Sequence, residues 1–154
     1  MKKVLLLLAV ITSLTTNAQW KQGNYVDEFG DKTGDTFMFM RAVGTFSNSA
    51  TQNSKCIYDF YDSDNDMIVE VKEYGSSMAT SINSTTEIVK IKTPSGEVKT
   101  VKNVFFSKSG SLVFMDNNYT QLKYILTEKG RYVMVFRRSG RYSSSSYKVI
   151  FNIE

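Results

Sequence analysis

Hydrophobic and polar residues alternate in short stretches along most of the chain. In residues 67–74, for example, Met67, Val69 and Val71 fall on one face, and residues 148–153 alternate in the same way. A period of two is typical of strands that turn one face to a core. The segments that we predict as strands are 36–43, 55–61, 67–74, 87–92, 98–102, 104–106, 112–115, 131–136 and 148–153.

Turn sequences separate these segments at short intervals. Residues 62–66 form a predicted hairpin loop, Pro94 and Gly96 mark a second turn, and residues 108–111 a third. Short, regularly spaced strands are typical of an all-β sandwich or barrel. We expect an antiparallel β-sandwich that forms a single domain over residues 19–154, with polar loops at 44–55 and 75–86.

One segment, residues 119–129, has the spacing of a helix. Tyr119, Leu122 and Ile125 fall on one helical face, and Gly130 follows as an end signal. We predict one short helix near 119–129. The alternative is a strand, because Leu122, Tyr124 and Leu126 also alternate.

The first 18 residues have the three parts of a secretory signal peptide. Lys2 and Lys3 open it, an apolar core follows, and Thr16-Asn17-Ala18 fits the small-x-Ala cleavage pattern. The apolar run is too short to span a bilayer as a helix. We therefore expect an exported protein, periplasmic or secreted, that is cleaved after Ala18 and has no stable membrane insertion afterwards.

The amino-acid composition indicates a large hydrophobic core and an uneven distribution of charge along the chain. Of the 154 residues, 42% are hydrophobic, with ten Phe and nine Tyr, which favours a folded domain. Residues 19–75 carry ten acids and five bases, whereas residues 120–154 carry two acids and seven bases. We expect this acidic front and basic back to face each other in the fold.

Several chemistries are excluded. The chain has no histidine, so Ser-His-Asp and Cys-His nucleophiles and histidine zinc sites cannot form. Its single cysteine, Cys56, cannot make an intramolecular disulfide, and its place in an alternating segment predicts a buried packing residue.

The best candidate metal site in the sequence matches a known calcium-binding loop only in part. Asp62, Asp64, Asp66 and Glu73 fall at positions 1, 3, 5 and 12 of an EF-hand-like loop. However, Met67 stands where that loop needs glycine, and the flanking segments are predicted strands rather than helices. We therefore expect an acidic hairpin tip and no metal or other cofactor. A second group of acids, in residues 27–35, is likewise interpreted as a turn.

A basic segment near the C-terminus is the candidate ligand site. Arg137, Arg138, Arg141 and Tyr142 combine guanidinium groups with an aromatic ring, which suits phosphate groups or sugars. The alternative is a solvated hairpin tip. Nucleic acid is not an expected partner, because an exported protein rarely meets it.

Three motifs together resemble a known group of proteins. They are Tyr25-Val-Asp-Glu-Phe-Gly-Asp-Lys-Thr-Gly34, Gly44-Thr-Phe-Ser-Asn-Ser-Ala-Thr51 and Glu73-Tyr-Gly75. The chain resembles an uncharacterised family of small exported β-rich bacterial proteins, and its first 19 residues resemble signal peptides of Bacteroidota. More distantly, the layout is similar to accessory proteins of type VI secretion. The resemblance implies a β-rich fold and no particular activity.

These observations favour an exported, non-enzymatic binding or interaction protein whose partner is a protein or an envelope glycan. The alternative is a small carboxylate-dependent hydrolase that acts on glycans. Such an enzyme needs a pair of carboxylates facing a cleft. Scattered acids and a filled core would favour the binding protein.

Overall fold

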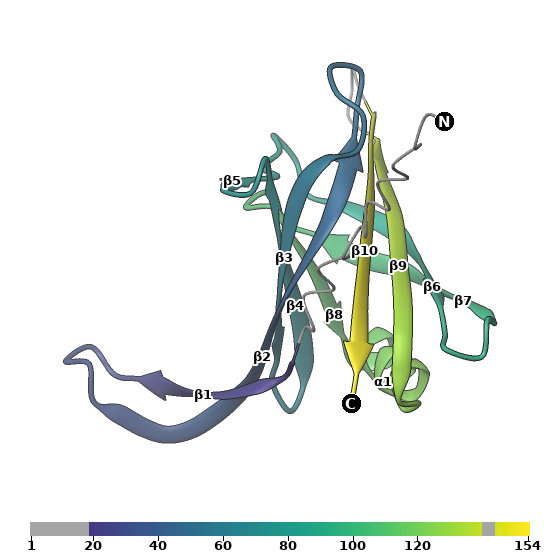
Figure 1. Cartoon of the computed structure of the whole chain (residues 1–154). Coiled ribbons are helices and arrows are strands. Elements are labelled where there is room, and N and C mark those ends of the chain that lie inside the picture. Colours follow the sequence, from purple (N-terminus) through teal and green to yellow (C-terminus); the bar gives the residue numbers. More distant parts are fainter. Residues whose placement is uncertain (1–18, 140–143) are drawn as a thin grey trace, which may run out of the picture.

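The structure is a computed structural model that describes residues 19–139 and 144–154 (Figure 1). Its elements are β1 (Lys21–Val26), β2 (Lys32–Ser47), β3 (Ser54–Asp62), β4 (Asp66–Glu73), β5 (Ser77–Met78), β6 (Thr85–Lys92), β7 (Val98–Phe106), β8 (Ser111–Met115), α1 (Asp116–Ile125), β9 (Gly130–Ser139) and β10 (Ser144–Ile153).

Eight of the strands close into an antiparallel barrel. Their order around the barrel is β2, β10, β9, β6, β7, β8, β4 and β3, and β3 pairs back to β2. The predicted β-sandwich is therefore wrong. A sandwich keeps two separate sheets, whereas each strand of this ring is hydrogen-bonded to a neighbour on both sides.

Closure depends on β2, which pairs with β3 on one edge and with β10 on the other. Gly44 is paired on both sides, opposite Cys56 and opposite Val149. A Cβ atom at Gly44 would overlap the carbonyl oxygen of Lys148 and lie 2.8 Å from the Cα of Val149. The missing side chain thus lets β10 approach β2, where the sequence predicted the start of a loop.

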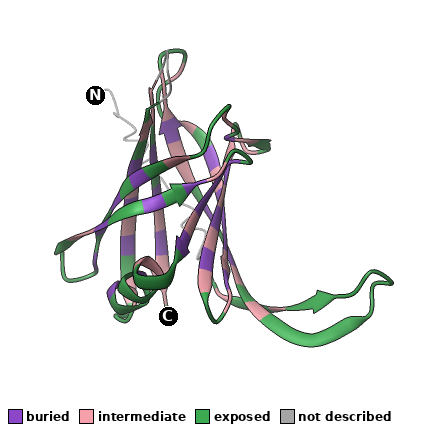
Figure 2. Ribbon diagram, turned by 180° about the vertical axis from the view of Figure 1, so that it is seen from behind, coloured by how far each residue is buried: buried purple, intermediate pink, exposed green. Residues whose placement is uncertain are grey.

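Buried positions alternate with exposed ones along the barrel strands (Figure 2). The side chains of the buried positions face inward and fill the barrel. An eight-stranded barrel is just wide enough for side chains to fill it. The largest fully buried ones are Tyr58, Tyr132, Tyr147, Phe46, Phe60, Phe106, Phe114, Phe151, Met40, Met67, Ile91 and Leu112. Cys56 is also fully buried, as its alternation predicted.

The predicted helix is present as α1, and the alternative strand is wrong. It runs from Asp116 to Ile125, earlier than the predicted 119–129, and buries Leu122 and Ile125. The helix packs beside β7 and β8 at one end of the barrel. Gly130 does not end it, because Gly130 already begins β9. The described part of the chain contains no helix long and apolar enough to cross a membrane.

A two-stranded arm projects from the barrel (Figure 1). We use "the arm" for residues 21–37, that is, β1, the turn after it and β2 up to Phe37. Pairing of β2 with β3 begins at Met38, so the first part of β2 extends past the barrel wall with only β1 beside it. Most of the arm is exposed (Figure 2). Of the acids in residues 27–35, Asp27, Glu28 and Asp31 lie in the turn between β1 and β2, as interpreted from the sequence, and Asp35 lies in β2.

Candidate binding groove on the barrel wall

The largest of the five described cavities is a groove on the outside of the barrel, with a volume of ≈ 690 Å³. It crosses four neighbouring strands, β2, β10, β9 and β6. This volume is in the range of ligand sites, which is roughly 300–1,000 Å³. Its side-chain lining from the four strands is Thr45, Ser47, Thr86, Glu87, Ile88, Lys90, Val135, Phe136, Arg137, Ser139, Ser146, Tyr147 and Lys148. A second cavity of ≈ 510 Å³ continues the groove, because Arg137 and Ser146 line both.

The groove forms because β6 separates from β9. The described pairing of β6 with β9 covers Val89 to Lys92, and an irregularity in β6 lies between Glu87 and Val89. The preceding residues of β6 therefore diverge from the end of β9 that carries Arg137. Hydroxyl groups and short side chains of β2 and β10 occupy the opposite side.

Stacked aromatic rings make a firm base beneath the groove. The rings of Phe136 and Tyr147 are 4.6 Å apart with an angle of 12° between their planes. The Tyr147 hydroxyl donates a hydrogen bond of 2.7 Å to Glu73. Burial, and then this bond to Glu73, raise the pKa of Tyr147, so its hydroxyl stays protonated at neutral pH.

Three cations stand in the groove wall: Lys90, Arg137 and Lys148. None of them forms an ion pair within the described residues, and the remaining residues, 1–18 and 140–143, contain no Asp or Glu. Arg137 is oriented by a 2.9 Å hydrogen bond that its Nη2 donates to Ser144 Oγ. With Glu87, the one acid in the lining, the groove has a formal net charge of +2 (3 − 1), so it presents positive charge to a ligand.

Apolar and acidic residues complete the lining. Ile88 is 54% exposed, and Val135 lies on the outward face of β9 next to Arg137. Glu87 is buried and accepts a 2.7 Å hydrogen bond from the Thr85 hydroxyl. The groove thus suits a ligand that is both anionic and partly apolar.

The structure separates the residues of the predicted basic site. Arg137 lies in the groove, whereas Arg138 points to the other face of β9 because side chains alternate along a strand. Arg138 donates hydrogen bonds to the carbonyl oxygens of Ala79 (2.8 Å) and Thr80 (3.1 Å), and its guanidinium lies 4.8 Å from the ring centre of Phe106. It therefore holds the segment after β5 to the barrel. Arg141 and Tyr142 lie outside the described residues.

The predicted metal candidates are also kept apart. Asp62 pairs with Met67 and Glu73 pairs with Cys56, so the two acids lie at opposite ends of the β3–β4 hairpin, about 20 Å apart. Asp64 is exposed, and Asp66 accepts a hydrogen bond from the Ser63 hydroxyl. Within the described residues, no three Cys, Asp or Glu side chains form a group that could hold a metal ion.

Asp62 instead connects the helix to the barrel. It accepts a 2.6 Å hydrogen bond from Lys123 Nζ and a 2.9 Å hydrogen bond from the Tyr119 hydroxyl. Burial, followed by the bond to Asp62, raises the pKa of Tyr119 to about 12. Asp62, the first position of the EF-hand-like loop, thus has a structural role and does not bind a metal with Glu73.

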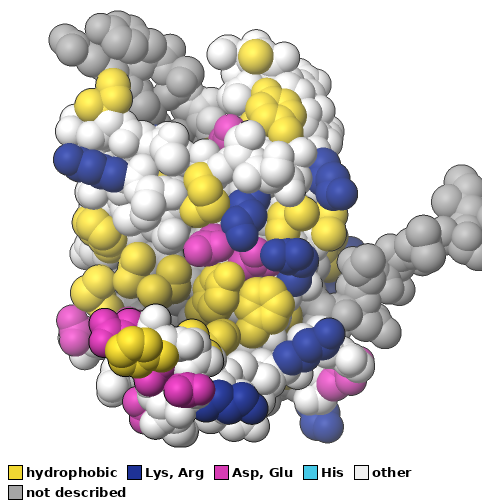
Figure 3. Space-filling view, turned by 90° about the vertical axis from the view of Figure 1, so that its left-hand side faces the viewer, with side chains coloured by type: hydrophobic (Ala, Val, Ile, Leu, Met, Phe, Trp, Pro, Cys, Tyr) yellow, Lys and Arg dark blue, Asp and Glu magenta, His cyan; other side chains and the backbone are white. Residues whose placement is uncertain are grey.

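Sequence reasoning missed Asp59, a fully buried acid on the outer face of β3. It accepts hydrogen bonds from Arg41 Nε (2.6 Å), Arg41 Nη2 (2.8 Å) and Lys72 Nζ (2.7 Å). Burial would raise the pKa of Asp59, but the hydrogen bonds and charges of Arg41 and Lys72 outweigh it and lower that pKa. One face of the molecule shows acids between Lys and Arg side chains above a hydrophobic patch (Figure 3).

The other cavities do not bring two carboxylates together. Glu87 lines the groove, and Glu73, Asp62 and Glu154 each line a different smaller cavity. No described cavity of the five is lined by two of the described carboxylates.

The fold and the groove together define a small all-β barrel with a cationic groove on its outer wall. No protein-family model matches the chain, and neither a curated protein nor a solved structure matches it.

Proposed function

We propose that this protein is a non-enzymatic binding protein whose groove holds an acidic, partly apolar segment of a partner protein. The observation that carries the proposal is the set of three cations, Lys90, Arg137 and Lys148, beside exposed apolar surface and without an ion pair in the described chain. Unneutralised charge in a concave wall attracts ligands of opposite sign.

The size and the mixed lining support a peptide segment. Ile88 and Val135 offer apolar contact, and the serine and threonine hydroxyls of β2 and β10 offer hydrogen bonds to a backbone. Specific sites combine apolar walls with a few placed polar groups in this way. The alternative, a carboxylate-dependent glycan hydrolase, lacks this support, because the described cavities contain at most one carboxylate each.

The test is fluorescence anisotropy with dye-labelled peptides of unrelated sequence. One carries four acids around a leucine, and its match replaces the acids by lysines. We expect binding of the acidic peptide only, and weaker binding at higher salt. Reversing charge with Lys90→Glu and Arg137→Glu together should weaken binding tenfold or more, about 1.4 kcal/mol.

The matched control reverses the same charge elsewhere. Lys102 and Lys108 are exposed and do not line the groove. Lys102→Glu with Lys108→Glu changes the net charge equally and should leave peptide affinity within about twofold, a difference of roughly 0.4 kcal/mol. Equal weakening by both double variants would mean that overall charge, not the groove, attracts the peptide.

We also propose that the protein is exported. The basic start, apolar core and Ala18 of the first 18 residues support cleavage after Ala18. Amino-terminal sequencing of protein from its native host should give Gln19, or a blocked end of matching mass. Recovery of soluble protein that still begins at Met1 would contradict the proposal.

A further inference from the structure

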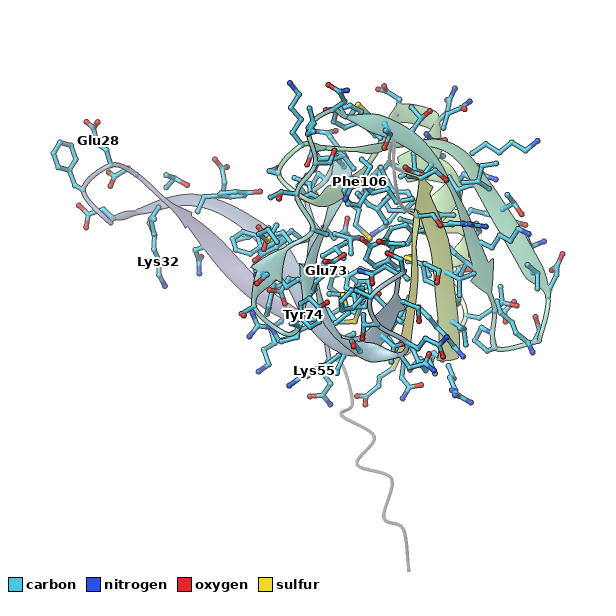
Figure 4. All side chains as sticks on the ribbon, turned by 90° about the horizontal axis from the view of Figure 1, so that it is seen from above. Glu28, Lys32, Lys55, Glu73, Tyr74 and Phe106 are labelled. Atoms are coloured by element: carbon cyan, nitrogen blue, oxygen red, sulfur yellow. The ribbon has the colours of Figure 1, made fainter. Side chains whose placement is uncertain are left out.

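The tip of the arm has the opposite character to the groove. Residues 25–35 contain four acids, Asp27, Glu28, Asp31 and Asp35, and one base, Lys32, so their net charge is −3 (1 − 4). Phe29 at the turn is 81% exposed. Glu28 and Lys32 lie at the far end of the arm, away from the barrel (Figure 4). The tip therefore offers an aromatic ring surrounded by carboxylates.

The turn at the tip has a defined shape. The Asp27 side chain accepts hydrogen bonds of 2.9 Å from the backbone N–H groups of Phe29 and Asp31. The backbone N–H of Asp27 donates to the Asp31 carbonyl at 2.8 Å, and Gly30 supplies the positive φ of +89° that closes the turn. Phe29 is thus presented by a pre-organised loop, which reduces the entropy lost on binding.

Aromatic contacts connect the arm to the barrel. Phe37 lies 5.0 Å from Tyr25 across the arm and 6.0 Å from Tyr61 on β3, measured between ring centres. The Phe37 ring covers Gly23, where a Cβ atom would clash with it. Phe39 continues the row at 5.2 Å from Tyr61. These contacts hold the arm in an extended position, although an isolated two-stranded hairpin is only marginally stable in water.

From this complementarity we infer that the arm of one copy docks in the groove of a second copy. The inference rests on the proposed function, because it names the occupant of the same groove. Phe29 would contact Ile88 and Val135, and the acids beside it would face the three cations of the groove. The tip has a net charge of −3, and the groove has a formal net charge of +2 from its three cations and Glu87. These opposite signs favour association and fix its direction.

The arm cannot reach the groove of its own chain. Strand β2 runs unbroken from Lys32 at the tip to Ser47, and Thr45 lines the groove. Lys32 and Thr45 are thirteen positions apart along an extended strand, which is about 40 Å of chain. The acids of the arm tip therefore do not face the groove of their own chain, whereas elsewhere the acidic front and the basic back do meet, as at the ion pair between Asp62 and Lys123.

The sizes of the two surfaces agree. The groove crosses four strands, a width of about 14 Å at the usual strand spacing, and a hairpin with its side chains is about 10 Å across. A hairpin tip in an open groove makes a small interface, so we expect dissociation constants on the order of 10–100 µM. Because two different surfaces meet, the assembly is head-to-tail and grows into rings or filaments.

Complementation between two variants tests this inference. The arm variant carries Glu28→Lys and Phe29→Ser, which are both on the exposed tip. The groove variant carries Lys90→Glu and Arg137→Glu, which both line the groove. Sedimentation velocity at low salt should show concentration-dependent assembly of the wild type and monomers for each variant alone. An equimolar mixture should form a 1:1 heterodimer and nothing larger, because one intact arm meets one intact groove.

Other outcomes overturn the inference in distinguishable ways. Wild-type protein that stays monomeric to millimolar concentration would refute docking of a second copy, while peptide binding by the groove would still support the proposed function. A groove variant that assembles while the arm variant does not would mean that the arm tip contacts a different surface of the second copy, which would refute docking in the groove. Assembly of the groove variant together with a groove that binds no peptide would remove both proposals. The Lys102→Glu, Lys108→Glu variant should assemble as the wild type does.

Discussion

The buried carboxylate of Asp59 gives the most direct test of what stabilises the barrel wall. In Asp59→Asn, three hydrogen bonds to charged donors, at 2.6, 2.8 and 2.7 Å, lose the ionic acceptor. Hydrogen bonds to charged groups contribute about 1.5–3 kcal/mol each. The loss is smaller than the sum, because the Arg41 side chain is 56% exposed and regains water, and asparagine keeps one acceptor oxygen. We expect the free energy of unfolding to fall by roughly 2–4 kcal/mol at pH 7.

The effect should depend on pH in one direction. Arg41 and Lys72 lower the pKa of Asp59 in the folded state, against the effect of burial. A lowered folded-state pKa stabilises the fold above the unfolded pKa of about 3.9, and this stabilisation is lost as pH falls through the folded value. The difference in unfolding free energy between wild type and Asp59→Asn should therefore be constant from pH 7 to about pH 5 and shrink below about pH 4.

Urea unfolding followed by the fluorescence of Trp20 measures both effects, because this single tryptophan packs edge-on against Phe60 at 6.4 Å between ring centres. Glu97→Gln is the control: Glu97 is 60% exposed and pairs with Lys99, so its loss should cost under about 1 kcal/mol. A difference between wild type and Asp59→Asn that is as large at pH 2 as at pH 7 would refute the ionic explanation.

Three further predictions concern the core, the closure of the barrel and metal. Cys56 is fully buried and burial raises its pKa to about 11, so a thiol reagent should react far more slowly with native than with denatured protein, and Cys56→Val should cost under about 1.5 kcal/mol; equal labelling rates would contradict this. Gly44→Ala would press a methyl group into β10 and should lower the free energy of unfolding by about 1–3 kcal/mol or more, measured in urea. Calorimetry should detect at most weak calcium binding, since Asp62 and Glu73 are at opposite hairpin ends; micromolar affinity lost in Asp64→Ala would show the reverse.

Alternation predicted the strands well, because it records which side chains face the core. Cys56, Tyr58 and Phe60 share the buried face that their spacing indicated. Strand ends were less predictable. The predicted segments 98–102 and 104–106 form one strand, β7, with Asn103 at a positive φ of 58° between them. Local sequence does not distinguish such an irregularity from a turn.

The closed barrel was not predictable from alternation alone. A sandwich and a barrel use the same short amphipathic strands and differ only in which distant strands pair. The decisive pairs here join β2 to β10, more than ninety residues apart in the chain, at Gly44 opposite Val149. Gly44 was assigned to the start of a loop because residues 44–55 are rich in Ser, Thr and Asn. Its role is to allow the close approach of two backbones.

The groove and the arm were even harder to predict from the sequence, because both consist of outward-facing residues. Of the predicted ligand residues that are described, only Arg137 lines the groove; Ile88, Lys90, Val135 and Lys148 come from strands whose neighbours the sequence does not reveal. The acids of residues 27–35 were visible, but turn chemistry explained them equally well. What distinguishes the arm is that β2 continues past the last residue of β3, so Phe29 is carried about 20 Å beyond the barrel. A core pattern constrains the inside of a barrel, whereas strand length and strand order decide which charges and rings the outside presents to a partner.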